Sequence, residues 1–164
     1  MKTRGLTLIE LVVAIGILGI FASFLFAAVN PLEQFKKASD SGRKSDLAQI
    51  QRAIESFNQD HGKYPDSTSS YKIDSDPGVG IVEVEWGGTF APYIDVLPKD
   101  AAKRSYVYYS TGQAYYLYAS LERGNKDTQV CKADGASCDN VPIGASCGTG
   151  FVCNYGASSP NVSP

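Results

Sequence analysis

The stretch that decides the fold begins five residues into the chain and reads Gly5-Leu6-Thr7-Leu8-Ile9-Glu10-Leu11. It opens an apolar segment that continues without a charge from Leu11 to Val29. A helix of this length crosses the ~30 Å hydrocarbon core of a bilayer. Glu10 is the residue to explain, because a carboxylate at membrane depth is costly unless it is paired, interfacial or functional. We therefore expect a transmembrane helix over residues 6–30 whose single acid has a compensating partner.

The residues around this segment set its orientation. Lys2 and Arg4 precede it and predict a cytoplasmic N-terminus, since positive residues are retained on that side. A cleaved secretory signal is one alternative, with residues 26–30 as a loose cleavage site, but the apolar core is longer than the ~7–15 residues usual in such signals. A plain single-pass anchor is another alternative, and it gives Glu10 no role.

Residues 4–13 combine a basic residue, a Gly, the run Leu-Thr-Leu-Ile-Glu and a long apolar stretch. This order resembles the class III signal of bacterial type IV prepilins and type II secretion pseudopilins. The resemblance implies that a prepilin peptidase cuts between Gly5 and Leu6 and that the new amine of Leu6 is methylated. Most members of the family have Phe where this chain has Leu6, and the change keeps a bulky apolar first residue.

The same resemblance gives Glu10 a role in assembly. After cleavage the amine of Leu6 is a new positive charge, and pairing with it removes much of the cost of a buried carboxylate. By resemblance, Glu10 pairs with the Leu6 amine of an adjacent subunit and sets the register of a filament. A carboxylate that lies at the interface and is solvated by lipid headgroups is the plainer alternative.

A second helical segment follows the first. Pro31 predicts a kink, because it lacks an amide proton and disfavours helical geometry at Asn30. A narrow apolar stripe then follows at helical spacing, through Leu32, Phe35, Ser39, Leu47, Ile50, Ile54 and Phe57. Asp40 and Lys44, four residues apart, are expected to pair on its surface. Gly62 predicts the end of this helix at His61, which we interpret as a helix-end residue and not a ligand.

The end of this helix carries a second resemblance. Residues 46–65 run into a Gly-Lys-Tyr-Pro turn and are similar to the helix end of major pseudopilins. Downstream, residues 64–80 read as an exposed loop, residues 90–97 as a short helical turn, and residues 81–86, 106–109 and 115–121 as strands. We expect an α+β, type IV pilin-like fold, in which the long N-terminal helix packs on a small antiparallel sheet.

The strands at 106–109 and 115–121 are rich in tyrosine, with Tyr106, Tyr108, Tyr109, Tyr115, Tyr116 and Tyr118. Tyrosines pair across sheets and cover their cores, and this is the favoured interpretation. A surface that stacks sugars or bases is the alternative. The net charge of −2, or −4 once Lys2 and Arg4 are removed, argues against nucleic-acid binding by the lone subunit.

All four cysteines fall in the last part of the chain, at Cys131, Cys138, Cys147 and Cys153. An exported domain with an even number of cysteines and little apolar content is a candidate for disulfides. Of the three connectivities we choose the sequential one, because it closes short loops. Zinc is the alternative, although no Cys-x-x-Cys knuckle is present.

No catalytic motif occurs, and the chain is not expected to be an enzyme. Glu83 and Glu85 lie on one face of an expected strand, where a solvated edge explains them. No cofactor is predicted, but calcium stays open. Major pseudopilins, by resemblance, often hold calcium in a loop after the sheet, and Asp127, Asp134 and Asp139 lie near Asn125 and Asn140. Turn-forming loops explain these residues equally well.

The sequence therefore predicts five regions. They are a prepilin leader at 1–5, a transmembrane assembly helix at 6–30, its amphipathic continuation at 31–63, a globular head with an antiparallel sheet at 64–130, and a disulfide-pinned loop region at 131–164. The favoured function is a structural pilin of a type IV pilus that serves adhesion, motility or DNA uptake. One alternative is a major pseudopilin of a type II secretion system. A monomeric membrane-anchored binding domain is an alternative of another class.

The resemblance also implies partners and a location. The partners are copies of the same chain in a helical filament, a prepilin peptidase, a platform membrane protein, an assembly ATPase and minor pilins. Before assembly the subunit is expected in the lipid of the inner membrane, and afterwards in an extracellular filament.

Overall fold

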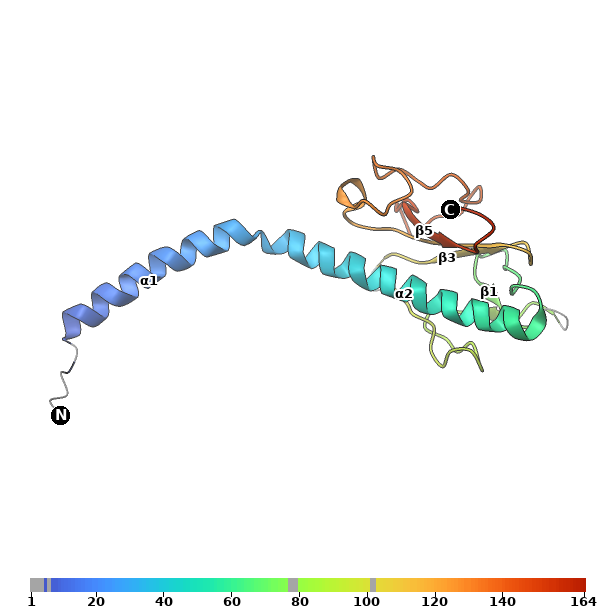
Figure 1. Cartoon of the computed structure of the whole chain (residues 1–164), viewed down its shortest axis with the longest axis horizontal. Helices are drawn as coiled ribbons and strands as arrows, with labels where there is room; N and C mark the ends of the chain where they lie inside the picture. The colour runs from blue at the N-terminus through green and yellow to red at the C-terminus, as the bar shows by residue number, and fades with distance from the viewer. Residues whose placement is uncertain (1–4, 6, 77–79, 101–102) are drawn as a thin grey trace. The chain divides into compact units, whose positions relative to one another are not determined.

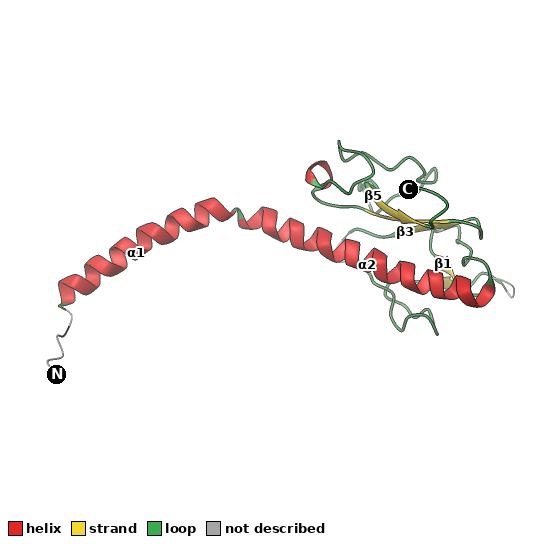
Figure 2. Cartoon of the chain, viewed as in Figure 1, coloured by secondary structure: helices red, strands yellow, loops and turns green. Residues whose placement is uncertain are grey.

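The computed structural model describes residues 5, 7–76, 80–100 and 103–164, and these form two compact units, residues 1–37 and residues 38–164. The elements, shown in Figures 1 and 2, are α1 (Leu8–Val29), α2 (Pro31–His61), β1 (Ile73–Asp74), β2 (Glu83–Val84), β3 (Val107–Ser110), β4 (Tyr115–Ala119), the 3₁₀ turn η1 (Gly124–Lys126) and β5 (Tyr155–Ser158). Helices and small antiparallel sheets together confirm the expected α+β class.

Helix α1 is apolar on all sides, as the sequence predicts for a membrane span. Its segment Leu8–Leu25 is long and apolar enough to cross a bilayer by length and composition. The helix ends where Asn30 adopts a left-handed conformation with φ of 35°, and α2 begins at the next residue, Pro31. Asn tolerates this conformation better than most residues, and Pro suits the first turn of a helix. The helix is thus interrupted at the predicted position.

Helix α2 ends at His61, as predicted. Gly62 has φ of 69° and donates its N–H to the carbonyl of Asn58 at 2.8 Å, which closes the last turn. The expected apolar stripe is correct only in its second half. Side chains from Leu47 to Phe57 on this stripe are buried, whereas Leu32 and Phe35 are about 70% exposed. These two residues belong to the first unit, which contains no sheet for them to contact.

The main sheet has three antiparallel strands in the order β3-β4-β5. Strands β3 and β4 form the predicted hairpin, with Ser110 opposite Tyr115 and Tyr109 opposite Tyr116. Strand β5 was not predicted, because it lies in the Gly- and Ser-rich end of the chain. It pairs with β4 so that Ala157 lies opposite Leu117.

Two other predictions for the loops before this sheet need correction. Residues 64–80 are not simply an exposed loop, because Ile73 in β1 is fully buried and β1 pairs with β2. The strand expected over residues 81–86 shortens to Glu83–Val84. The segment 90–97 does contain a short turn as expected, with the N–H of Tyr93 and of Ile94 bonded to the carbonyl of Phe90.

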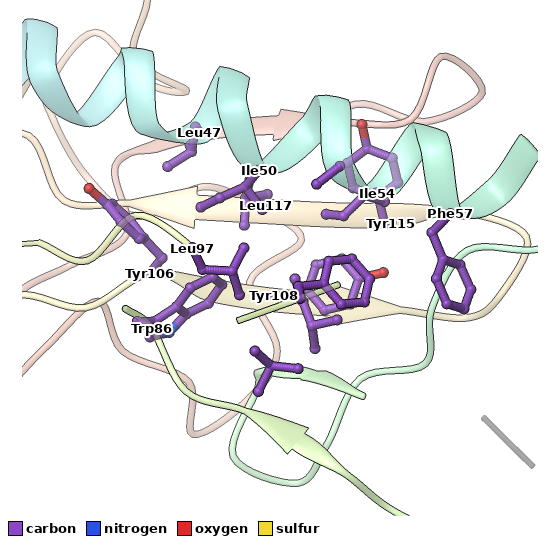
Figure 3. Close-up of a cluster of buried hydrophobic side chains, with 14 of the residues drawn as sticks. Leu47, Ile50, Ile54, Phe57, Trp86, Leu97, Tyr106, Tyr108, Tyr115 and Leu117 are labelled. Carbon is purple, nitrogen blue, oxygen red and sulfur yellow. The ribbon is translucent and has the colours of Figure 1, made fainter. Parts of the chain in front are cut away.

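One face of the three-stranded sheet packs on α2 and forms the main core of the second unit (Figure 3). Ile50, Ile54 and Phe57 from the helix meet Leu117 and Tyr115 from the sheet. Tyr106, Tyr108, Tyr115 and Tyr118 are all buried, which confirms the packing interpretation for these four tyrosines. Burial of their rings supplies much of the apolar area that stabilises so small a core.

The other face of the sheet is covered by the cysteine tail, by which we mean residues 131–154, before β5. Tyr118 and Val107 pack there against buried cysteines. The structure joins Cys131 to Cys138 and Cys147 to Cys153, which is the sequential connectivity. The cysteine tail therefore packs on the sheet and forms part of the fold.

Candidate assembly site

The site begins at the N-terminus of α1, where Thr7 and Glu10 form a capping box. The hydroxyl of Thr7 accepts the N–H of Glu10 at 3.3 Å. Glu10 Oε2 in turn accepts the backbone N–H and the hydroxyl of Thr7, both at 2.8 Å. A carboxylate at this end of a helix also interacts favourably with the helix dipole. The chain itself thus supplies part of the compensation that Glu10 requires.

The sequence analysis singled out Glu10 but missed the contribution of Thr7. The signal was present, since Thr-Leu-Ile-Glu before an apolar run fits the Ser/Thr-x-x-Glu pattern of a capping box. Gly5 is exposed, and Leu6 lies outside the described residues. One residue, Leu6, therefore separates the predicted cleavage point from Thr7, which caps α1.

The surface of α1 is the second part of the site. Its large apolar side chains are between 49% exposed, at Ile17, and 81% exposed, at Leu8. A shallow groove of about 360 Å³ runs along one face and is lined by Ile9, Glu10, Val13, Ala14 and Ile17. A methyl group added at Gly16 or Gly19 would meet no atom within 4 Å. Within its unit, α1 therefore leaves its apolar surface available to lipid or to other helices.

A buried ionic cluster fixes the start of the second unit. Arg43 Nε donates to Asp100 at 2.6 Å, and its Nη atoms donate to Asp40 at 2.9 Å and to Glu122 at 3.1 Å. Burial opposes the charge on Arg43, but the bonds to Asp100 and Glu122 outweigh it and raise the pKa of the guanidinium. The predicted pairing of Asp40 with Lys44 is wrong, because Asp40 pairs with Arg43 three residues away.

Lys44 reaches another segment instead. Its ammonium donates to Asp127 Oδ2 at 2.6 Å and to Gln129 Oε1 at 2.8 Å, and it lies 5.4 Å from the ring centre of Tyr155. Burial alone would raise the pKa of Asp127, but the Lys44 contact and the N–H of Gln129 lower it below its usual value. The cluster and this bridge join residues far apart in sequence, which the sequence pattern could not show.

The residues proposed for calcium do not fit that ion. Asp127 is bound to Lys44, Asp134 accepts the N–H of Ala136 at 2.9 Å, and Asp139 pairs with Lys132 at 2.5 Å. In the part of the chain that the structure describes, no cluster of three or more His, Cys, Asp or Glu residues could hold a metal. These carboxylates are engaged by the protein's own donors.

The remaining polar residues singled out by sequence have structural partners. His61 stacks on Phe57 with ring centres 4.0 Å apart, and its Nδ1 lies 3.1 Å from the Phe57 carbonyl. Glu83 and Glu85 are not merely solvated, because both pair with Lys72, at 2.9 and 2.5 Å. Bonds from Thr68 and Lys72 lower the pKa of Glu83. These contacts hold the helix end and the β1–β2 hairpin in place.

Comparison with known proteins places these features in a family. A sequence profile described as "Type II secretion system (T2SS), protein G" matches residues 30–138, and one described as "Prokaryotic N-terminal methylation motif" matches residues 1–26. The type II secretion system core protein G of Vibrio cholerae serotype O1 is 29% identical over 136 residues, which are 82% of this chain and 83% of that protein. No solved structure matches the chain. With its apolar helix, capped N-terminus and small antiparallel head, the chain belongs to the type II secretion system protein G family, the type IV pilin-like major pseudopilins.

Proposed function

We propose that this chain is the major pseudopilin of a type II secretion system and polymerises through α1 into a filament. The observation that carries the proposal is the exposed apolar surface of α1, from Leu8 to Leu25, with one acid, Glu10, at its head. Exposed apolar surface of this extent marks a membrane or protein contact. The subunit acts as a structural part of the machine and not as an enzyme, which is inferred from its family.

The proposed assembly step follows from the geometry at Glu10. Both bonds from Thr7 go to Oε2, so that within the described residues Oε1 is left for a second donor. Cleavage between Gly5 and Leu6 would create an amine one residue before Thr7. The amine of a neighbouring subunit is a donor of the right charge for Oε1, and pairing in low dielectric offsets the cost of both charges.

We infer the remaining features from the family and from this geometry. The leader is residues 1–5, the amine of Leu6 is methylated, and the N-terminus is cytoplasmic before assembly. Small residues on α1, including Gly16 and Gly19, allow helices to approach closely in the filament core. A prepilin peptidase, a platform protein, an assembly ATPase and minor pseudopilins are the proposed partners.

Two other functions are ranked below this one. The sequence favoured a surface type IV pilus, but the family match and the Vibrio cholerae relative support the pseudopilin alternative instead. A monomeric membrane-anchored binding domain would leave the Gly5–Leu6 bond intact and would tolerate the loss of the Glu10 charge.

The test combines processing with assembly in cells. Mass spectrometry of the membrane fraction is expected to find a methylated N-terminal peptide that begins at Leu6. Glu10→Gln is expected to be processed normally but to lose subunit cross-links between cysteines introduced into α1. Glu33→Gln, which changes a partly exposed acid paired with Lys36 at 3.3 Å, is the matched control and keeps the cross-links.

Three outcomes separate the alternatives. Recovery of the chain mainly in filaments sheared from the cell surface would favour the type IV pilus. Persistence of residues 1–5 on the mature chain would overturn the filament proposal. Undiminished cross-linking of Glu10→Gln would remove the proposed role of this carboxylate while leaving the family unchanged.

A further inference from the structure

The loop that follows β4, residues 120–140, is rich in acids and lies against α2 through ion pairs. We propose that this post-β4 loop is locked by the chain's own cations, Lys44 and Arg43, and that the second unit therefore folds without a divalent cation. The proposal concerns the folding of one subunit. It does not depend on whether the subunit assembles into a filament.

Lys44 lies against Asp127, one of the three carboxylates considered for calcium. Its ammonium bonds to oxygens of Asp127 and Gln129 at 2.6 and 2.8 Å and faces the ring of Tyr155. The other oxygen of Asp127 accepts the N–H of Gln129 at 2.9 Å, so both oxygens of this carboxylate have protein partners. The side chains of Lys44 and Asp127 are only 21% and 17% exposed, which limits competition from water.

Arg43 and Asp40 fix the beginning of the same loop. Asp40 accepts the backbone N–H of Glu122 at 2.8 Å and that of Arg123 at 2.9 Å. Arg43 donates to the carboxylate of Glu122 at 3.1 Å. Two consecutive residues of α2, Arg43 and Lys44, thus hold two separate points of the loop.

The charge balance leaves no need for a further cation. The post-β4 loop contains four acids and three bases, and Arg43, Lys44 and Arg104 pair with its acids from outside the loop. Calcium prefers six to eight oxygen ligands at ~2.3–2.6 Å, usually with several carboxylates. An ammonium already placed between the candidate oxygens repels such an ion strongly at short range. The disulfide between Cys131 and Cys138 restrains the rest of the loop.

A cation that is part of the chain, such as Lys44, affects the stability of the loop differently from a bound ion. Its local concentration is fixed by the fold, so the loop does not depend on the ion content of the surroundings. A divalent ion would instead add stability that rises with its concentration. The distinction can be measured directly.

The experiment uses the full chain in detergent micelles, with disulfides intact, and follows thermal unfolding by circular dichroism. Wild type, Lys44→Met and Lys63→Met are compared in about 2 mM EDTA and in about 2 mM calcium chloride. Lys63 is the control because it forms one exposed pair with Asp66 at 3.1 Å. We expect wild-type melting temperatures that agree within ~1 °C in the two media, and a value for Lys44→Met at least ~3 °C below that of Lys63→Met.

Two results would overturn the proposal. One is a rise of about 3 °C or more in the wild-type melting temperature on addition of calcium chloride. The other is a Lys44→Met variant as stable as Lys63→Met. If Lys44→Met does not fold, the wild-type comparison of EDTA with calcium still decides the question of the divalent ion.

Discussion

Arg43 and Asp100 are 57 residues apart in the sequence, yet Arg43 Nε donates to Asp100 at 2.6 Å with both side chains less than 10% exposed. The bond ties α2 to the segment after Leu97. Asp40 and Glu122 share the same guanidinium, so three carboxylates pair with one cation, and Glu122 also pairs with Arg104 at 3.5 Å. The cluster is therefore sensitive to the loss of that cation.

We expect Arg43→Met to lower the free energy of unfolding by about 3–5 kcal/mol, because it removes the cation that pairs with the buried carboxylates of Asp40 and Asp100. Denaturant titration followed by the fluorescence of Trp86, the one tryptophan of the chain, reports on this unit. Arg52→Met removes an exposed arginine from the same helix and should change stability by less than about 0.5 kcal/mol. Equal effects of the two variants would show that the cluster does not stabilise the fold.

Two buried tyrosines differ in their hydroxyl partners and should respond differently to phenylalanine. Tyr108 donates to the carbonyl of Pro65 at 2.7 Å, so Tyr108→Phe should cost about 1 kcal/mol. The hydroxyl of Tyr118 is buried without a hydrogen-bond partner among the described residues, so Tyr118→Phe should stabilise by roughly 1 kcal/mol. Denaturant titration of both variants tests the sign. A loss of stability in Tyr118→Phe would reveal a bound water or an undescribed partner.

Burial of tyrosines also predicts cooperative unfolding in alkali. Burial raises the pKa of Tyr106, Tyr108, Tyr115 and Tyr118 above the usual value near 10. The neutral forms are favoured in the folded state, so their contribution to stability is complete below about pH 10 and is lost as the pH rises above it. The loss is about 1.4 kcal/mol per pH unit for each tyrosine. The part of the tyrosinate absorbance at 295 nm that these four residues contribute should appear only with the loss of circular dichroism, and ionisation of all ten tyrosines in a protein that keeps its circular dichroism would contradict this.

The two disulfides should not be equally important. Their loops are of similar size, with sequence separations of 7 and 6, so the loss of chain entropy is similar. Cys147 and Cys153 are almost fully buried beneath the sheet, whereas Cys131 is half-buried. We expect serine at both Cys147 and Cys153 to destabilise more than serine at both Cys131 and Cys138, measured by thermal unfolding. The reverse order would mean that the post-β4 loop, and not the sheet contact, is the critical element.

The sequence was sufficient for elements whose signals are local. The break at Pro31, the end of α2 at Gly62 and the hairpin of β3 and β4 each depend on residues within one or two turns of the chain. Strand β5 depends on a distant partner. Its sequence Tyr-Gly-Ala-Ser has little strand propensity of its own, and it is extended because β4 offers it a ladder of hydrogen bonds.

The residues of the candidate site show the same difference between local signals and distant partners. Glu10 was found because one charge interrupts an apolar run, and this signal needs no tertiary information. The contacts of Arg43 and Lys44 could not be found, because helical spacing places Lys44 beside Asp40 while the fold offers it Asp127, 83 residues away. Leu32 and Phe35 match the apolar spacing of α2 but are about 70% exposed, so periodicity alone predicted too much burial.

The order of strands in the main sheet has a consequence for the edges that the sheet exposes. Strand β4 is the central strand, and its second neighbour, β5, consists of residues 155–158 near the end of the sequence. A chain truncated before these residues would present β4 as an unpaired edge, open to pairing with other chains. Pairing with β5 therefore protects this edge of β4, and a variant that cannot form β5 would expose it.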